Sequence, residues 1–174
     1  MKTSWLAACL VVAACGGGTP STQGSASAAP PADTGPAQPA TPRVAACSLM
    51  TRADVRALLG RPVSDGRQED AAELSTCQYG VTIGAGAPPM VLLTVGVFSG
   101  TRPGQAQGVY DIARRNAAGV EAVAGLGDEA YWDDLLHTLR TVRGNVQIDV
   151  TIASDLGGLK MARAVAEKLL GALR

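Results

Sequence analysis

The side chains with the greatest capacity for chemistry gather between residues 128 and 137. Four carboxylates and the single histidine of the chain lie there: Asp128, Glu129, Asp133, Asp134 and His137. Carboxylates and imidazole bind divalent cations, and histidine is a common general acid or base. The spacing lacks the acidic alternation of a calcium loop, and no nucleophile motif accompanies His137. Two interpretations stay open: a metal-dependent or histidine-based enzyme site using His137 and residues 128–134, or an acidic turn beside a structural histidine.

Cys15 is the second candidate. One positive charge, a short apolar run over residues 5–12 and two small residues precede it, which is the arrangement of a secretory signal. The run is too short to span a bilayer, which takes about 20 residues. Val12-Ala13-Ala14-Cys15 resembles the lipobox of bacterial lipoproteins. That resemblance implies cleavage before Cys15 and lipidation of its sulfur; the alternative is an ordinary secretory signal with an incidental cysteine.

Two further cysteines, Cys47 and Cys77, remain after Cys9 leaves with the signal and Cys15 receives lipid. Export would place this pair in an oxidising compartment, where paired cysteines usually form a disulfide. A redox pair would more often have the C-x-x-C spacing, and zinc would need further ligands nearby. We therefore predict a structural disulfide between Cys47 and Cys77, and no cofactor.

Large aromatic side chains are scarce, at 3% of the chain. Tyr131 and Trp132 stand next to each other, and two interpretations are open for them. If they are exposed, they could contact a partner, because aromatic residues dominate interface hot spots. If they are buried, they belong to the core.

Composition divides the chain into three parts. Residues 1–14 are the predicted signal peptide. Residues 15–42 form a lipidated, Pro/Gly/Ser/Ala-rich tether that cannot bury enough surface to fold. Residues 43–174 are long enough for one domain with its own core. The 15 basic residues balance 15 acidic ones, so nothing in the net charge points to nucleic acid.

Apolar periodicity and turn residues predict the elements of the domain. Helices are expected over residues 51–59, 103–118 and 158–173, and strands over 76–83, 90–98, 129–132, 136–143 and 146–153. Residues 64–75 are expected to be a surface loop. In the middle helix, the apolar stripe is expected to contain Val109, Ile112, Ala113 and Asn116.

Gly144-Asn145 predicts a two-residue hairpin turn. Counting outward from it, Leu139 opposes Val150 and Arg140 opposes Asp149 as a cross-strand ion pair. Short connections favour antiparallel pairing. The predicted fold is α+β: an antiparallel sheet of about five strands, with the helices packed mainly on one face.

Three short motifs carry a resemblance to a family. They are Cys47-Ser48-Leu49-Met50-Thr51, Cys77-Gln78-Tyr79, and Gly125-Leu126-Gly127-Asp128-Glu129-Ala130. With these motifs the domain resembles the small lipoprotein domains of unknown function that are common in actinobacteria, relatives of which occur as extracytoplasmic sensor modules. The resemblance implies a lipobox, a disordered spacer, a disulfide and an α+β fold, and it carries no catalytic residues.

These observations lead to one leading hypothesis and two alternatives. We expect an exported envelope lipoprotein, held at the membrane by lipid on Cys15, whose domain is a non-enzymatic binding or sensor-like module for an envelope protein or a small ligand. The alternatives are the enzyme described above and an accessory structural lipoprotein without a ligand.

Overall fold

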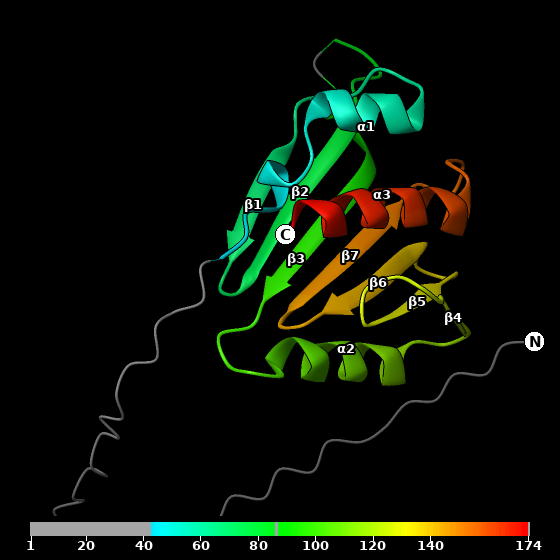
Figure 1. The fold of residues 1–174 in the computed structure, drawn as a ribbon. Helices are drawn as coiled ribbons and strands as arrows, with labels where there is room; N and C mark the ends of the chain where they lie inside the picture. The colour runs from blue at the N-terminus through cyan, green and yellow to red at the C-terminus, as the bar shows by residue number, and fades with distance from the viewer. Residues whose placement is uncertain (1–42, 86, 174) are drawn as a thin grey trace, which may run out of the picture. The chain divides into compact units, whose positions relative to one another are not determined.

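The computed structural model describes residues 43–85 and 87–173. The predicted signal peptide, Cys15 and the tether lie outside the described residues. The described part is a seven-stranded antiparallel sheet with three α-helices and one short 3-10 helix (Figure 1). None of the helices in this part is long and apolar enough to cross a membrane.

The elements follow one another in this order: η1 (Ala46–Ser48), α1 (Arg52–Leu59), β1 (Arg67–Ala71), β2 (Leu74–Val81), β3 (Met90–Ser99), α2 (Gln105–Asn116), β4 (Val120–Ala122), β5 (Glu129–Asp133), β6 (Thr138–Arg143), β7 (Val146–Ile152) and α3 (Gly158–Ala172).

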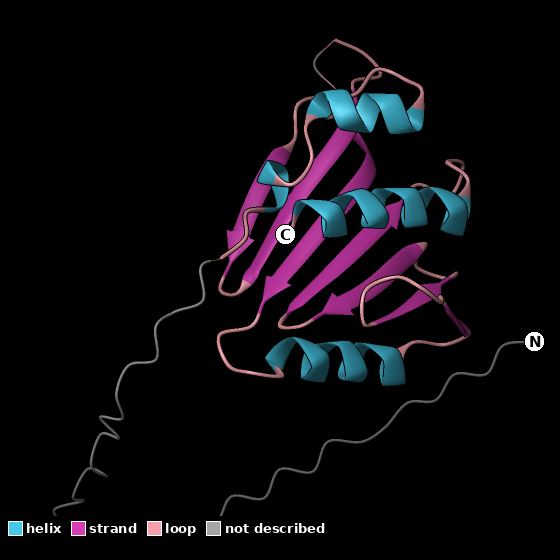
Figure 2. Cartoon of the chain, viewed as in Figure 1, coloured by secondary structure: helices cyan, strands magenta, loops and turns pink. Residues whose placement is uncertain are grey.

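The sheet consists of two meanders joined side by side. Its strand order is β1-β2-β3-β7-β6-β5-β4, and all neighbours are antiparallel (Figure 2). After β3 the chain passes through α2 to the far edge at β4 and then returns strand by strand to β7. Because of this route, α2 lies beside β6 and β7.

The β6–β7 hairpin has the predicted register. Gly144 and Asn145 form its turn, and Gly144 has a φ of 56°, which glycine adopts without strain. Leu139 opposes Val150, and Arg140 opposes Asp149. The predicted ion pair forms, with 3.1 Å between Arg140 Nε and Asp149 Oδ2.

The prediction of about five strands was wrong, because the sheet has seven. β1 lies in the segment expected to be a surface loop, and all five of its residues are exposed, so it has no alternating apolar signal. β4 has only three residues. Both are edge strands, which bury least and therefore leave the weakest pattern in a sequence.

The first helix is fixed at both ends by its own capping residues. Thr51 and Asp54 form a reciprocal capping box, and Gly60 ends the helix in the left-handed conformation, with a φ of 64°. Asp54 also accepts a bond from Lys168 Nζ at 2.9 Å, which ties α1 to α3.

The two faces of the sheet are covered by different helices. Tyr131 and Trp132 are neighbours in β5 and so point to opposite faces. Trp132 belongs to the main core, a large buried cluster that includes residues of α1 and α3. Tyr131 belongs to a smaller cluster with Ala106 and Tyr110 of α2 and Val142 of β6, called here the α2 cluster. Two of the three helices therefore pack on one face and α2 on the other.

The expected apolar stripe of α2 was wrong. The helix buries Ala106 and Tyr110, whereas Ile112 is 54% exposed. Tyr110 is the bulkiest side chain of the helix, and its ring packs 5.2 Å from that of Tyr131. Burying this ring rotates the helix away from the orientation that would bury Ile112.

Candidate functional site

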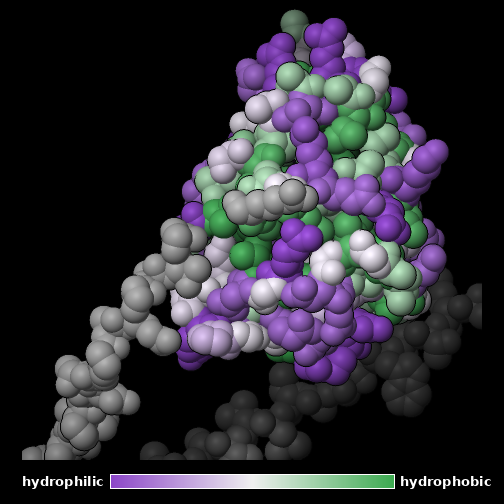
Figure 3. Space-filling view, viewed as in Figure 1, coloured by the Kyte–Doolittle hydropathy of each residue, from purple (hydrophilic) through white to green (hydrophobic). Residues whose placement is uncertain are grey.

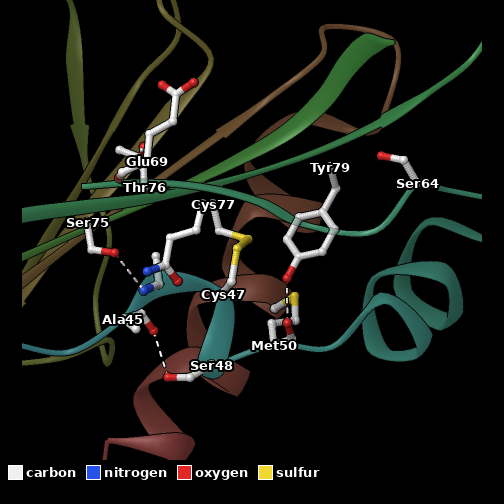
Figure 4. The surroundings of a disulfide bond; sticks show 12 residues. Ala45, Cys47, Ser48, Met50, Ser64, Glu69, Ser75, Thr76, Cys77 and Tyr79 are labelled. Carbon is white, nitrogen blue, oxygen red and sulfur yellow. Dashed lines mark hydrogen bonds between the residues drawn. A yellow bond between two sulfur atoms is a disulfide. The ribbon is translucent and has the colours of Figure 1, made fainter.

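The predicted disulfide between Cys47 and Cys77 is confirmed. It joins η1 to β2, and Cys77 is fully buried. Figure 4 shows two hydrogen bonds that reinforce this connection. Ala46 N donates to Ser75 Oγ at 2.9 Å, and the Tyr79 hydroxyl donates to the Met50 carbonyl. The disulfide and these two hydrogen bonds together hold the segment around η1 against β2.

Each carboxylate of the 128–134 segment has a partner within the fold. Asp133 caps the β5–β6 turn by accepting from Leu135 N and Leu136 N, both at 3.1 Å. The other partners are Gly144 N for Asp128, Arg114 for Glu129 and Trp132 Nε1 for Asp134. Among the described residues, no group of three or more His, Cys, Asp or Glu side chains is placed to hold a metal ion.

His137 lies in the β5–β6 turn and not in the strand where it was expected. β6 begins at Thr138, and His137 has a φ of 48°. Its ring centroid is 6.2 Å from that of Trp132. The structure therefore places His137 against an aromatic side chain of the main core.

Tyr131 and Trp132 are core residues. Tyr131 is fully buried and Trp132 is 4% exposed. Of the two interpretations of this pair, burial is the one that the structure shows, so neither side chain is available as an exposed anchor for a partner. The contact surface has to be sought in other residues.

A polar chain runs beside the α2 cluster on the same face of the sheet. Arg140 donates from Nη1 to the Tyr131 hydroxyl at 2.8 Å and from Nε to Asp149. The other oxygen of Asp149 accepts from Gln147 Nε2 at 2.8 Å. The guanidinium also lies 5.9 Å from the centroid of the Tyr131 ring. Arg140 is thus held in one orientation by two neighbours, Tyr131 and Asp149.

Burial opposes the charged form of each ionisable side chain in this row of polar residues. It raises the pKa of Tyr131, against the hydrogen bond from Arg140, and it raises the pKa of the Asp149 carboxyl, against the Arg140 charge. Burial opposes ionisation of Arg140 as well, but the charge of Asp149 and the Tyr131 hydroxyl outweigh it and raise the pKa of the guanidinium. Arg140 is therefore a permanent cation and hydrogen-bond donor at neutral pH.

Two buried polar atoms on this face have no hydrogen-bond partner among the described residues. They are the hydroxyl of Tyr110, whose pKa burial raises to about 12, and Oε1 of Gln147. An unsatisfied buried group costs about 1–3 kcal/mol. The face under α2 is consequently less well satisfied than the main core.

A groove of about 370 Å³ opens between the carboxyl-terminal half of α2 and the β5–β6 turn. We call it the α2 groove. Leu135 and Leu136 stand on one wall with 77% and 53% of their surfaces exposed. The lining residues are Ala113, Asn116, Ala117, Ala118, Asp133, Leu135, Leu136 and Arg140. The groove therefore combines apolar walls with the guanidinium of Arg140.

Two other hollows lie at α1. One, of about 630 Å³, is lined by Arg52, Arg56 and Arg61, but two of these arginines form exposed ion pairs, with Asp65 and Asp155. The other, of about 290 Å³, lies between α1 and α3. Hydrophobic and hydrophilic residues are interspersed over the face that carries these helices (Figure 3). Neither hollow has a fixed, part-buried charge like that of Arg140.

The sequence did not point to the α2 groove. Leu135 and Leu136 are adjacent leucines in a polar turn, which is the one signal that could have marked them as exposed apolar residues. The expected strand start at residue 136 hid this signal. Arg140 was found only as half of an ion pair.

Residues 10–152 of the chain match a family described as proteins of unknown function, DUF3558. This chain belongs to the DUF3558 family. The predicted resemblance to a family of unknown function is thereby confirmed. The DUF3558 match includes the disulfide, the acidic segment and every residue of the α2 groove, whereas α3 lies beyond it. No curated protein and no solved structure matches the chain.

Proposed function

We propose that this protein is an exported envelope lipoprotein, anchored through lipid on Cys15, whose domain is a non-enzymatic binding module. The supporting features of the sequence are the short apolar run, the small residues before Cys15 and the Pro/Gly-rich segment after it. The disulfide supports export, because disulfides persist mainly in oxidising compartments.

The α2 groove is the observation on which the binding role depends. Exposed leucines are unremarkable singly, but Leu135 and Leu136 are adjacent and border a hollow that contains a fixed cation. Small-molecule sites combine largely apolar walls with a few well-placed polar groups and measure about 300–1,000 Å³. The α2 groove matches this description in its lining and lies at the lower end of that range.

Mass spectrometry of the mature protein tests the anchor. We expect an amino-terminal Cys15 carrying a diacylglyceryl group, and no residue before it. Cys15→Ser should abolish lipidation and release the protein from membranes, whereas Cys9→Ser, within the predicted signal, should change neither. An intact Met1 on the wild-type protein would show that the proposed export and lipid anchoring are wrong.

Site-specific photocrosslinking in living cells tests the groove. A photoreactive amino acid at position 135 or 136 should give one discrete adduct, either a protein or a small molecule. The matched control is position 74, since Leu74 is an exposed leucine of the same sheet that does not line the groove. Identical products from positions 74 and 136 would mean that the groove has no selective ligand.

A further inference from the structure

We propose that the α2 groove binds a small amphiphilic acid, with its carboxylate on Arg140 and its hydrocarbon body against Leu135, Leu136 and Ala117. This inference rests on the proposed binding role and names the chemistry of the ligand.

Arg140 has hydrogen-bond donors left over for an acceptor on a ligand. Arginine has five N–H donors in a rigid planar fork. Asp149 occupies Nε and the Tyr131 hydroxyl occupies one hydrogen of Nη1. Nη2 makes no hydrogen bond among residues 43–85 and 87–173. The Arg140 side chain is 19% exposed overall and is one of the residues that line the groove. A guanidinium that is already fixed loses little conformational freedom when it binds a ligand.

The acidic side chains next to Arg140 have hydrogen-bond partners of their own. Both oxygens of Asp149 accept hydrogen bonds, one from Arg140 and one from Gln147. Asp133 Oδ1 is occupied by two backbone amides of the turn. Asp133 also lines the groove, and it makes no hydrogen bond to Arg140. The remaining donors of Arg140 are available to an acceptor from outside the chain, and a carboxylate both fits the planar guanidinium fork and carries the complementary charge.

The walls of the groove indicate that the ligand has a hydrocarbon part. Ala113 of α2 and Ala117, which caps the carboxyl end of that helix, line a hollow whose other side carries Leu135 and Leu136. The small alanine side chains leave room beside the helix, and the exposed leucines would lose contact with water when a hydrocarbon chain is bound. Each fully buried methylene strengthens binding about fourfold.

Octanoate is the probe, with butyrate, 1-octanol and octylamine for comparison. The protein is the full-length Cys15→Ser chain, which carries no acyl group and needs no detergent. Binding is followed by NMR, through the side-chain Nε–H signal of Arg140 and the methyl signals of Leu135 and Leu136. Octanoate should shift both sets of signals and bind at least about tenfold more tightly than butyrate. The alcohol and the amine should leave the Arg140 signal unchanged.

Two variants assign the contacts. Arg140→Lys keeps the charge next to Asp149 but loses the fork, so it should weaken octanoate at least about tenfold. Leu135→Ser/Leu136→Ser changes only exposed side chains, so it should fold normally and abolish the difference between octanoate and butyrate. Leu74→Ser is the matched control and should bind as the parent chain does.

The outcomes separate this inference from the broader proposal. A selective crosslink at position 136 without octanoate binding would overturn the amphiphilic acid and leave the groove as a binding site. Octanoate binding that is insensitive to both groove variants would place the acid elsewhere and equally overturn the inference. If neither a selective crosslink nor octanoate binding is found, both the ligand and the binding role are wrong.

Discussion

The two faces of the sheet differ in how many apolar side chains they bury and in how completely their buried polar atoms are hydrogen-bonded. On the face of α1 and α3, the main core encloses many apolar side chains, the disulfide joins η1 to β2, and the buried Tyr79 hydroxyl is hydrogen-bonded. On the face of α2, four fully buried residues form the cluster, and two buried polar atoms lack partners in the described part of the chain. The first face therefore holds the larger share of the buried apolar side chains. The second contains the part-buried ion pair, the exposed leucines and the groove.

This contrast indicates where selection for stability gives way to other demands. Natural proteins tend to break the rules of packing and polar satisfaction at functional sites. Both unpartnered buried polar atoms of the described residues lie on the α2 face, and the exposed Leu135 and Leu136 border the groove there. That concentration is what makes the α2 groove a better candidate than the larger hollow at α1.

The largest expected effect comes from the disulfide. Replacing both cysteines, in Cys47→Ala/Cys77→Ala, should lower the free energy of unfolding by about 3.5 kcal/mol, because the bond closes a loop in the unfolded chain. The two cysteines are 30 positions apart. Urea unfolding measures the loss, and reduction of the wild-type protein should give a similar value. An unchanged midpoint in both experiments would show that the anchorage of η1 does not depend on the bond.

A matched pair of helix substitutions compares the two faces directly. Leu169→Ala in α3 removes a fully buried side chain and should cost about 3 kcal/mol. Ile112→Ala in α2 removes a side chain that is 54% exposed and should change stability by less than about 0.5 kcal/mol. Chemical denaturation of both variants provides the test. A loss of several kcal/mol for Ile112→Ala would mean that α2 buries the stripe first expected from the sequence.

Ile112 also shows which parts of the fold could be predicted from the sequence and which could not. The register of β6 and β7, the position of α1 and the Cys47–Cys77 bond followed from local rules that act within a turn, a single helix or a cysteine pair. Orientation of α2 did not, because two neighbouring stripes of that helix are both apolar and the choice depends on the partner of Tyr110 across the sheet. The strands β1 and β4 were missed for the opposite reason, since edge strands bury few side chains and leave little apolar pattern in the sequence. The groove is lined by the carboxyl-terminal half of α2, so it depends on the orientation of that helix and could not be predicted.

Two buried tyrosines, one on each face, test the difference in polar satisfaction. Tyr79 and Tyr110 are 1% and 0% exposed. Tyr79→Phe removes a hydroxyl that donates to the Met50 carbonyl and should cost about 1 kcal/mol. Tyr110→Phe removes an unpartnered hydroxyl and should leave stability unchanged or raise it by about 1 kcal/mol. If Tyr110→Phe is as destabilising as Tyr79→Phe, the Tyr110 hydroxyl has a partner and the contrast between the faces is smaller than it looks.

The smallest effect is a difference in pH dependence between two aspartates. Hydrogen bonds from the Thr51 backbone, Lys168 and the Thr51 hydroxyl lower the pKa of Asp54 from 3.8 to about 2. Its contribution to stability is therefore present above its ordinary pKa and is lost as the pH falls towards about 2. Burial raises the pKa of Asp149, so its contribution has the opposite sign: it is present below the ordinary pKa and is lost as the pH rises through the folded-state value.

Asp54→Asn and Asp149→Asn should accordingly diverge when urea unfolding is measured between about pH 3 and pH 6. The deficit of Asp54→Asn relative to wild type should shrink on acidification, because the wild type loses the contribution that the variant never had. The deficit of Asp149→Asn should grow, because the wild-type carboxyl takes up a proton more readily in the folded state than in the unfolded chain. Taking each deficit at every pH cancels the other titrating groups, so only these two sites remain. Parallel deficits would mean that burial on the α2 face does not control the Asp149 carboxyl, and that its environment is set by Arg140 alone.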